Sequence, residues 1–260
     1  MQKLVFLTLT LFASLQAKIF EIQNFKQVVS YLNKETLLIL DIDDTLMIPE
    51  QMLGCDEWFM HRLKKWEKEI AFSEALEKTL AEWEAIRHLT RMEIVEPGTD
   101  HIVQDLQSQG YCVMGLTTQG IALATRTSQQ LKINHFDLSM TAPSKEDCFF
   151  TLKNHGVLYR NGILFTSGRP KGEALFQCCE KIGYKPKRIV FVNDKEAHIA
   201  DLEETATAKG VECIGLRYAY SDAKKAAFSP EVAEFQFTHS SFDRILSDKE
   251  AKEQCKAALH

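Results

Sequence analysis

The run LLILDIDDTL, residues 37–46, constrains the fold of this chain more than any other segment. Its apolar part is unbroken, which is typical of a strand buried on both faces in a parallel α/β sheet. Ligand sites in such sheets lie beyond the carboxyl ends of the strands. We therefore expect Asp41, Asp43 and Thr45, which follow the apolar part, to emerge at a ligand site.

The two aspartates of this run are separated by a single residue. Like charges held this close oppose joint ionisation, so either one carboxyl keeps a proton or a cation lies between them. Both arrangements suit phosphoryl transfer, with Asp41 or Asp43 as nucleophile and its neighbour as acid and base. The competing interpretation is an acidic turn with Asp44 or Thr45 capping a helix, and for Asp44 alone that interpretation is the better one.

The composition is that of a globular protein. With 260 residues, of which 45% are hydrophobic, the chain can form one large domain or two small ones around a proper core. The net charge is -5, and the basic residues form no cluster. A nucleic-acid partner or an anionic membrane surface is therefore not indicated.

Residues 1–17 have the layout of a secretory signal peptide, with a lone Lys3, an apolar centre and Ala17 at the end. The apolar segment is too short to span a bilayer comfortably, and Leu15 is a poor residue for the third-from-last position before cleavage. An uncleaved anchor and a cytosolic N-terminal strand are the alternatives. We expect residues 18–260 to be exported, to the periplasm or out of the cell, without a stable membrane span.

The seven cysteines are odd in number and show neither a CxxC motif nor a His/Cys pattern at zinc spacing. They do not describe a disulfide framework, and their pairing stays open. Exported chains often pair their cysteines, so this count agrees poorly with a signal peptide.

The segment 47–96 is rich in Glu, Lys and Trp. Its apolar residues recur at spacings of three and four, as on amphipathic helices, so we expect an inserted pair of helices here. The three tryptophans of the chain all lie in this segment, where packing is their expected role rather than a cofactor site.

Strands and helices alternate after this segment, which predicts a three-layer, Rossmann-like α/β fold with a mostly parallel sheet and a helical cap inserted after the first strand. Asn161-Gly162 between apolar arms predicts a tight hairpin. We expect the last forty residues, with Phe235–Phe237 and a short helix at 242–246, to lie against the sheet edge. Further expected strands are 111–117, 188–193 and 211–219, and further expected helices are 100–108, 121–131 and 171–180.

With these elements in place, the chain resembles the haloacid dehalogenase-like (HAD) hydrolase superfamily over roughly residues 35 to 220, in its acid-phosphatase-like branch with a helical cap. The DxDxT motif of that family is matched by residues 41–45, and its Thr or Ser at a strand end by Thr117. Its Lys at a helix start is matched by Lys171 in RPKGEAL, and its acidic motif after a strand is matched in part by Asp194 in VFVNDKEAH.

The resemblance implies roles for these residues. Asp41 would attack phosphorus and become an aspartyl phosphate, and Asp43 would be the acid and base. Lys171 would offset negative charge on Asp41 and on the phosphoryl oxygens, to which Thr117 would donate a hydrogen bond. Mg²⁺, a cofactor that prefers oxygen ligands, would be bound by Asp41, the backbone carbonyl of Asp43, and Asp194.

The chain departs from the family pattern at one position. A further acid commonly follows the aspartate of the fourth motif by four or five residues, where this chain has His198 and Ile199. A missing carboxylate there would loosen the metal site.

Three functions are compatible with these motifs. The first is a Mg²⁺-dependent, exported phosphatase acting on a small or medium phosphorylated molecule under a cap formed by residues 47–96. The second is a secreted binding or interaction protein with little or no turnover. The third, a narrower one, is a phosphotransferase. The sequence names neither the substrate nor the oligomeric state.

Overall fold

A computed structural model describes residues 19–241 and 244–258. The expected signal peptide at 1–17 lies outside the described residues. An eight-stranded sheet in the order β1-β10-β9-β2-β5-β8-β7-β6 forms the centre of the fold, and β3 and β4 pair separately as a short antiparallel ribbon. The strands are β1 (Ile19–Ile22), β2 (Thr36–Leu40), β3 (Met47–Pro49), β4 (Met92–Ile94), β5 (Cys112–Thr117), β6 (Cys148–Leu152), β7 (His155–Arg160), β8 (Ile163–Phe165), β9 (Arg188–Asn193) and β10 (Glu212–Tyr218).

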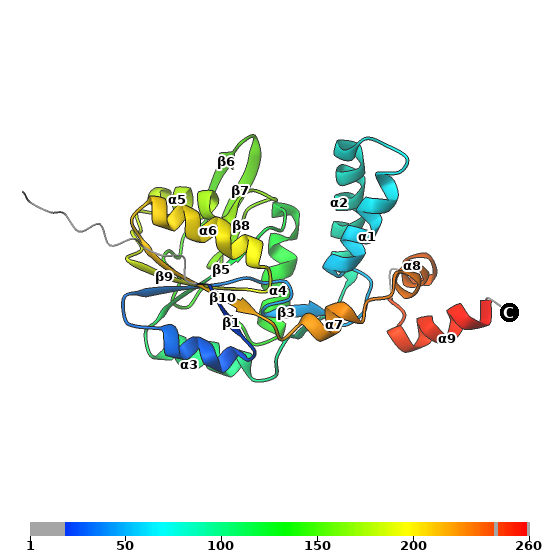
Figure 1. The fold of residues 1–260 in the computed structure, drawn as a ribbon, viewed down its shortest axis with the longest axis horizontal. Coiled ribbons are helices and arrows are strands. Elements are labelled where there is room, and N and C mark those ends of the chain that lie inside the picture. The colour runs from blue at the N-terminus through cyan, green and yellow to red at the C-terminus, as the bar shows by residue number, and fades with distance from the viewer. Residues whose placement is uncertain (1–18, 242–243, 259–260) are drawn as a thin grey trace, which may run out of the picture.

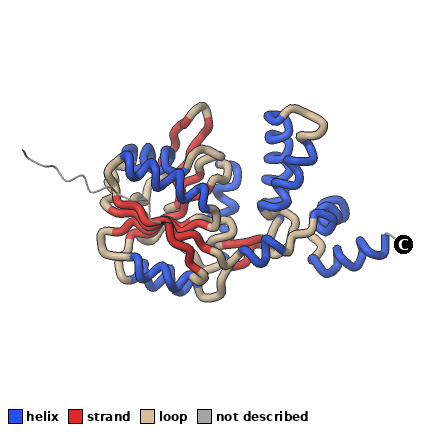
Figure 2. The backbone as a smooth tube through the Cα atoms, viewed as in Figure 1, coloured by secondary structure: helices blue, strands red, loops and turns tan. Residues whose placement is uncertain are grey.

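Helices cover both faces of the sheet and extend beyond one end of it (Figures 1 and 2). Helices α5 and α6 lie on one face, and α3 lies on the other, as Figure 1 shows. The helical elements are the 3₁₀ turns η1 (Phe25–Tyr31) and η2 (Ile121–Leu123) and the helices α1 (Asp56–Trp66), α2 (Phe72–Leu89), α3 (Thr99–Ser108), α4 (Ala124–Ile133), α5 (Lys171–Lys181), α6 (Glu196–Ala208), α7 (Asp222–Ala226), α8 (Pro230–His239) and α9 (Asp248–Ala258).

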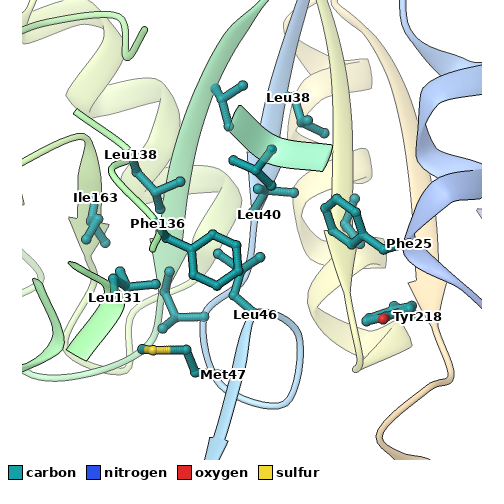
Figure 3. Packing of buried hydrophobic residues seen from close by; sticks show 14 of the residues in the cluster. Phe25, Leu38, Leu40, Leu46, Met47, Leu131, Phe136, Leu138, Ile163 and Tyr218 are labelled. Atoms are coloured by element: carbon teal, nitrogen blue, oxygen red, sulfur yellow. The ribbon is translucent and has the colours of Figure 1, made fainter. Parts of the chain in front are cut away.

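The central strand β2 is buried on both faces, as its apolar sequence predicts. Successive side chains of a strand point to opposite faces, so β2 contributes to two separate cores. Leu37 and Ile39 join the core beneath α5 and α6. Leu38 and Leu40 join the opposite core, whose close packing with Phe136 and Leu131 is seen in Figure 3. The three-layer architecture expected from the sequence is therefore confirmed.

Six of the eight strands are parallel, from β1 to β8 in the sheet order. The predicted turn at Asn161-Gly162 is confirmed, since both residues have positive φ, 51° and 74°, and join the antiparallel strands β7 and β8. A second hairpin turns at Lys153-Asn154, with φ of 48° and 68°, and adds β6 at the sheet edge. The edge strands β6 and β1 were not predicted from the sequence.

The inserted segment is less purely helical than expected. It begins and ends with β3 and β4, which pair antiparallel and hold the two ends of the segment together. Between these strands, α1 and α2 pack on each other as a helical hairpin. Trp58 is fully buried and Trp83 nearly so, in a small core that is separate from the two cores of the sheet.

Of the C-terminal helices, α8 packs on α1 of this helical hairpin and α9 packs on α8, so neither lies along the sheet edge as expected from sequence (Figure 1). Phe237 belongs to α8 and contacts Trp58, with ring centroids 5.3 Å apart. Arg62 of α1 bonds to Glu82 of α2 and to Glu234 of α8, each at 2.8 Å. Within the expected helix 242–246, residues 244–246 are not helical, and residues 242–243 lie outside the described residues.

No helix in the described ranges is long and apolar enough to cross a membrane.

Candidate active site

The carboxyl end of β2 lies where the chain changes direction across the sheet. From β2 the chain passes to β5 on one side, and β9 later pairs with β2 on the other side. Such a switch point leaves a crevice at the carboxyl ends of the strands, where α/β proteins bind ligands. Asp41 follows β2 directly, and its backbone N–H donates to the carbonyl of Val192 in β9 at 3.0 Å. The first aspartate of the motif is thus fixed in the centre of the sheet end.

Lys171 reaches Asp41 although the two residues are 130 positions apart. Its Nζ lies 2.6 Å from Asp41 Oδ1 and 3.1 Å from the backbone oxygen of Leu116, and its side chain is 1% exposed. Burial raises the pKa of Asp41 to about 6, with Lys171 opposing the rise and the nearby carboxylates of Asp194 and Asp43 adding to it. The predicted pairing of this lysine with the first aspartate is therefore present in the geometry.

Gly172 allows Lys171 to be placed this deeply. A Cβ at Gly172 would lie 2.3 Å from Thr205 Oγ1 and 2.9 Å from the backbone oxygen of Asp201, so only glycine permits this approach of α5 to α6. The backbone N–H of Gly172 also donates to Asp201 Oδ2 at 3.0 Å. The first turn of α5, which carries the lysine, is therefore locked against α6.

Asp43 is bonded on both carboxylate oxygens. Nη2 of Arg87, at the end of α2, donates to Oδ1 at 2.5 Å, and Nε2 of Gln119 donates to Oδ2 at 2.8 Å. Thr127 in turn donates to Gln119 Oε1 at 2.5 Å. The inserted helical hairpin therefore contributes a buried guanidinium to the site, on the residue expected to act as acid and base.

Asp194 follows β9 and lies beside the first motif. Its backbone N–H donates to Thr45 Oγ1 at 3.2 Å, which joins the first and fourth motifs directly. Lys225 of α7 donates to Asp194 Oδ2 at 2.9 Å. The other oxygen, Oδ1, is buried and has no hydrogen-bond partner among the described residues.

Thr117 is buried at the end of β5, next to the carbonyl that Lys171 contacts. Its hydroxyl accepts a hydrogen bond from the backbone N–H of Gln119 at 3.2 Å, and so keeps its own proton to donate elsewhere. This placement leaves Thr117 beside the site, and its role toward a phosphoryl group remains an expectation.

Asp44 does not cap a helix, contrary to the interpretation favoured from sequence. Its φ is 59°, and its backbone N–H donates to Met47 in a turn that leads into β3, while the next helix starts only at Asp56. Burial raises the pKa of Asp44 well above its usual range, and the charges of Asp56 and Asp194 add to this rise. Burial at this position therefore disfavours the charged form of Asp44.

Four carboxylates of the site each have one ammonium or guanidinium partner. Asp56, the first residue of α1, pairs with Lys195, which directly follows Asp194. The complete set of pairs is Asp41 with Lys171, Asp43 with Arg87, Asp56 with Lys195, and Asp194 with Lys225. Only the first of these cations was expected from the sequence motifs.

Magnesium binding requires oxygen ligands, and the site supplies them in part. Among the described residues, no three His, Cys, Asp or Glu side chains are grouped to hold a metal ion. The expected set needs only two carboxylates, from Asp41 and Asp194, plus the backbone oxygen of Asp43, because Mg²⁺ usually keeps several waters. Oδ1 of Asp194, which has no hydrogen-bond partner among the described residues, is available as a ligand for a cation. These residues are therefore suited to bind Mg²⁺.

His198 occupies the position where the family commonly has an acid. Burial, together with the charges of Lys171 and Lys195, lowers the pKa of its imidazole to about 3. A neutral imidazole therefore stands where a carboxylate was expected, and its Nδ1 has no partner in the described part of the chain.

The site is closed in this structure. Asp41 is 5% exposed, Asp194 3% and Arg87 1%. A cavity of about 420 Å³ lies elsewhere, between the end of α2 and the segment that precedes α9, and residues such as Leu89, Arg91 and Arg244 line it. The carboxylates of Asp41 and Asp194 therefore have little contact with solvent in this structure.

Sequence reasoning missed Arg87, Gln119, Lys225 and the pair of Lys195 with Asp56. Gln119 had a usable signal, since it follows the expected strand-end threonine by two positions. Arg87 is one charge among many on an amphipathic helix, and Lys225 lies beyond the last matched motif. Neither position carries a local pattern that indicates a role in the site.

The chain belongs to the protein family described as "Protein of unknown function (DUF2608)", which matches residues 21–252. Two chlamydial proteins named "Putative outer membrane protein" are similar to it. The one from Chlamydia pneumoniae is 22% identical over 251 residues, covering 91% of this chain and 89% of that protein. The one from Chlamydia muridarum is 23% identical over 229 residues, covering 86% and 83%.

Solved structures also show similarity. A haloacid dehalogenase-like family hydrolase from Streptococcus pneumoniae is 16% identical, with a TM-score of 0.44 over 68% of this chain and 82% of that one. A phospho-aspartyl intermediate analogue of phosphoserine phosphatase is 16% identical, with a TM-score of 0.37 over 75% of this chain and 99% of that one.

Proposed function

We propose that this protein is a Mg²⁺-dependent phosphohydrolase that cleaves a phosphate monoester through transfer of the phosphoryl group to Asp41. The observation that carries the proposal is the convergence of remote groups at the end of β2. Lys171 bonds to Asp41 at 2.6 Å, and the backbone N–H of Asp194 bonds to Thr45 at 3.2 Å. The carboxyl ends of parallel strands lie at the same edge of the sheet, so residues that follow these strands come close together there.

In the first half of the reaction, a carboxylate oxygen of Asp41 attacks phosphorus, and the bond from phosphorus to the ester oxygen breaks. Asp43, which takes up a proton when it exchanges its bonds to Arg87 and Gln119, gives that proton to the leaving oxygen, which departs as an alcohol. Lys171 stabilises the negative charge that gathers on the phosphoryl oxygens. The Oγ–H of Thr117, whose lone pair accepts from Gln119, is free to donate to the same oxygens.

In the second half, Asp43 removes a proton from water, and the resulting hydroxide attacks phosphorus of the aspartyl phosphate. Inorganic phosphate leaves and the Asp41 carboxylate is restored. When bound, Mg²⁺ neutralises charge between the phosphoryl group and the carboxylates. Asp41, Asp194 and the backbone oxygen of Asp43 would hold the ion.

The residues around Asp43 define when this chemistry can proceed. Arg87 and Gln119 bond both of its oxygens in the closed structure, so Asp43 must exchange at least one of them for a substrate oxygen or water. Since Arg87 belongs to α2, we propose that the segment 47–96, which contains α1 and α2, acts as a cap whose movement frees Asp43. A cap of this size suits a small or medium phosphorylated molecule.

The proposal is tested by measuring phosphate release from an aryl phosphate at pH 7, with Mg²⁺ or with EDTA. Asp41→Asn removes the nucleophile and should abolish release, and EDTA should do the same to the wild type. Asp147→Asn is a matched control, because Asp147 pairs with Arg160 on the surface at 2.6 Å, away from the site. Equal release by Asp41→Asn and the wild type, or none by the wild type, would reject the mechanism.

A second candidate function is a binding protein with little turnover. One observation favours it, namely that Asp43 and Asp194 already have partners in Arg87, Gln119 and Lys225. Beryllium fluoride, which mimics a phosphoryl group on an aspartate, separates the two functions. Mg²⁺-dependent binding of this fluoride that is lost in Asp41→Asn would argue against a purely binding role.

Export of residues 18–260 is proposed together with this activity. The signal-like layout of residues 1–17 supports it, as do the names of the chlamydial relatives. All seven cysteines, each within the described ranges, are free thiols. This agrees less well with export, because exported chains often pair their cysteines. N-terminal sequencing of the protein from fractionated cells tests the proposal, and an intact N-terminus in the cytosolic fraction would contradict it.

A further inference from the structure

Lys225 occupies an unexpected position for a lysine outside the sequence motifs. It belongs to the short helix α7, which follows the last strand of the sheet, and its side chain is only 17% exposed. Its Nζ donates to Asp194 Oδ2 at 2.9 Å and lies 3.1 Å from Asp222 Oδ1. The ammonium group therefore lies between a buried carboxylate of the site and a more exposed carboxylate on its own helix.

Neighbouring contacts hold α7 in this place. Arg217, at the end of β10, donates twice to Asp222, at 2.5 and 2.9 Å. Lys224 donates to the backbone oxygen of Pro49 at 2.7 Å and pairs with Glu93, which attaches α7 to the β3–β4 ribbon. The backbone near Lys225 is thus fixed on two sides, and a displaced Lys225 ammonium keeps Asp222 as a partner.

We propose that Lys225 competes with the divalent cation for Asp194 and so sets the metal affinity of the site. This inference rests on the metal site of the proposed function. An ammonium and a divalent cation on one carboxylate repel each other strongly in a buried environment. Metal binding to Asp194 Oδ1 therefore weakens the Lys225–Asp194 contact and favours a shift of Lys225 toward Asp222, and the free energy lost with this contact weakens metal binding.

The same contact places a compensating positive charge beside the buried side chain of Asp194. A buried carboxylate without a compensating charge is costly. Lys225 supplies that charge and leaves Asp194 Oδ1 without a partner, ready to contact a cation. The lysine thus acts as a resident counter-ion whose positive charge opposes a metal ion at Oδ1.

The test measures binding of Mn²⁺, a Mg²⁺ substitute whose free concentration is read by electron paramagnetic resonance, to the full chain. Lys225→Met removes the charge and keeps the length of the side chain. We expect it to bind Mn²⁺ about ten to a hundred times more tightly than the wild type, the factor that loss of one charged hydrogen bond allows. Lys225→Arg keeps the charge and should stay near the wild type.

Lys224→Met is the matched control, because it removes the same charge from the next position of the same helix without touching Asp194. A tightening in Lys224→Met equal to that in Lys225→Met would overturn the proposal, as it would indicate a general charge effect. Unchanged or weaker binding in a folded Lys225→Met variant would also overturn it. So would the absence of Mn²⁺ binding by both the wild type and Lys225→Met.

A second measurement covers the case in which Lys225→Met is unstable without metal. Thermal unfolding should then show a larger Mn²⁺-induced rise in Tm for Lys225→Met than for the wild type, because a ligand stabilises the form that binds it more tightly. No larger rise would count against competition. Tighter Mn²⁺ binding in Lys225→Met combined with no phosphate release by the wild type would refute the hydrolase and leave this inference standing.

Discussion

Replacement of Lys171 by methionine tests the electrostatics of the site without relying on any enzymatic activity. The substitution removes the ammonium 2.6 Å from Asp41 and leaves a carboxylate that is 5% exposed without its partner. Burial already raises the pKa of Asp41 from 3.8 to about 6 while Lys171 opposes the rise. Keeping this group ionised in the folded wild type therefore costs about 3 kcal/mol above pH 6, at about 1.4 kcal/mol for each pKa unit.

Without Lys171 the pKa of Asp41 rises further, because the interaction that lowers it is gone. Removing one partner of a buried ion pair destabilises a protein by about 3–5 kcal/mol. We expect Lys171→Met to lower the free energy of unfolding by about this amount at pH 8. A carboxyl whose folded pKa is raised binds its proton more tightly in the folded state. The loss caused by Lys171→Met is therefore small below the wild-type folded pKa of about 6, grows as pH rises above it, and is largest above the still higher folded pKa in the variant.

The assay is urea unfolding in EDTA at pH 5 and pH 8. Lys171→Met should lose clearly less stability at pH 5 than at pH 8, and Lys171→Met/Asp41→Asn should recover most of the loss at pH 8. Lys153→Met is the control, because Lys153 pairs with Glu173 on the surface and should change stability by less than about 0.5 kcal/mol. Equal losses at both pH values, or no recovery in the double variant, would refute the reasoning.

Three further predictions concern the elements that hold the site. Gly172→Ala should cost about 1–3 kcal/mol in urea unfolding, because the added Cβ overpacks the contact between α5 and α6; no loss would contradict this packing. His198 has a pKa lowered to about 3, so the unfolded chain takes up its proton from pH 6.5 downward while the folded chain does not. Stability should therefore fall on acidification by up to about 1 kcal/mol per pH unit, and His198→Gln should make that fall shallower than in the wild type; parallel curves would exclude the effect. Arg62→Met breaks the bonds to Glu82 and Glu234 that join α1, α2 and α8, so acrylamide should quench tryptophan fluorescence more strongly than in the wild type; unchanged quenching would show that the junction does not depend on them.

The sheet and the first contacts of the site were predictable because their signals are local. The apolar runs of β2 and β9 fall within a residue or so of the observed strands, since a strand buried on both faces leaves no polar alternation. Lys171 was predictable from its motif, and parallel topology then brings it to Asp41.

The other charges of the site were not predictable because they belong to no sequence motif and their partners are distant in sequence. The pattern of α2 shows which face is apolar but not that Arg87 reaches Asp43 from its last turn. Helix α8 has a weak amphipathic pattern, and it packs on α1 through contacts such as Arg62 with Glu234 instead of lying along the sheet edge. Asp44 was misassigned because an acidic turn after a strand is ambiguous until the next helix is located.

Identification of a phosphorylated residue during turnover tests the central claim most directly. The protein is mixed with an aryl phosphate and Mg²⁺, quenched in acid within the first turnovers, reduced with borohydride and digested for mass spectrometry. The account predicts that Asp41 alone is converted to homoserine, the product of a reduced aspartyl phosphate. Phosphate release with an unmodified Asp41, or with the phosphoryl group on another residue, would contradict it.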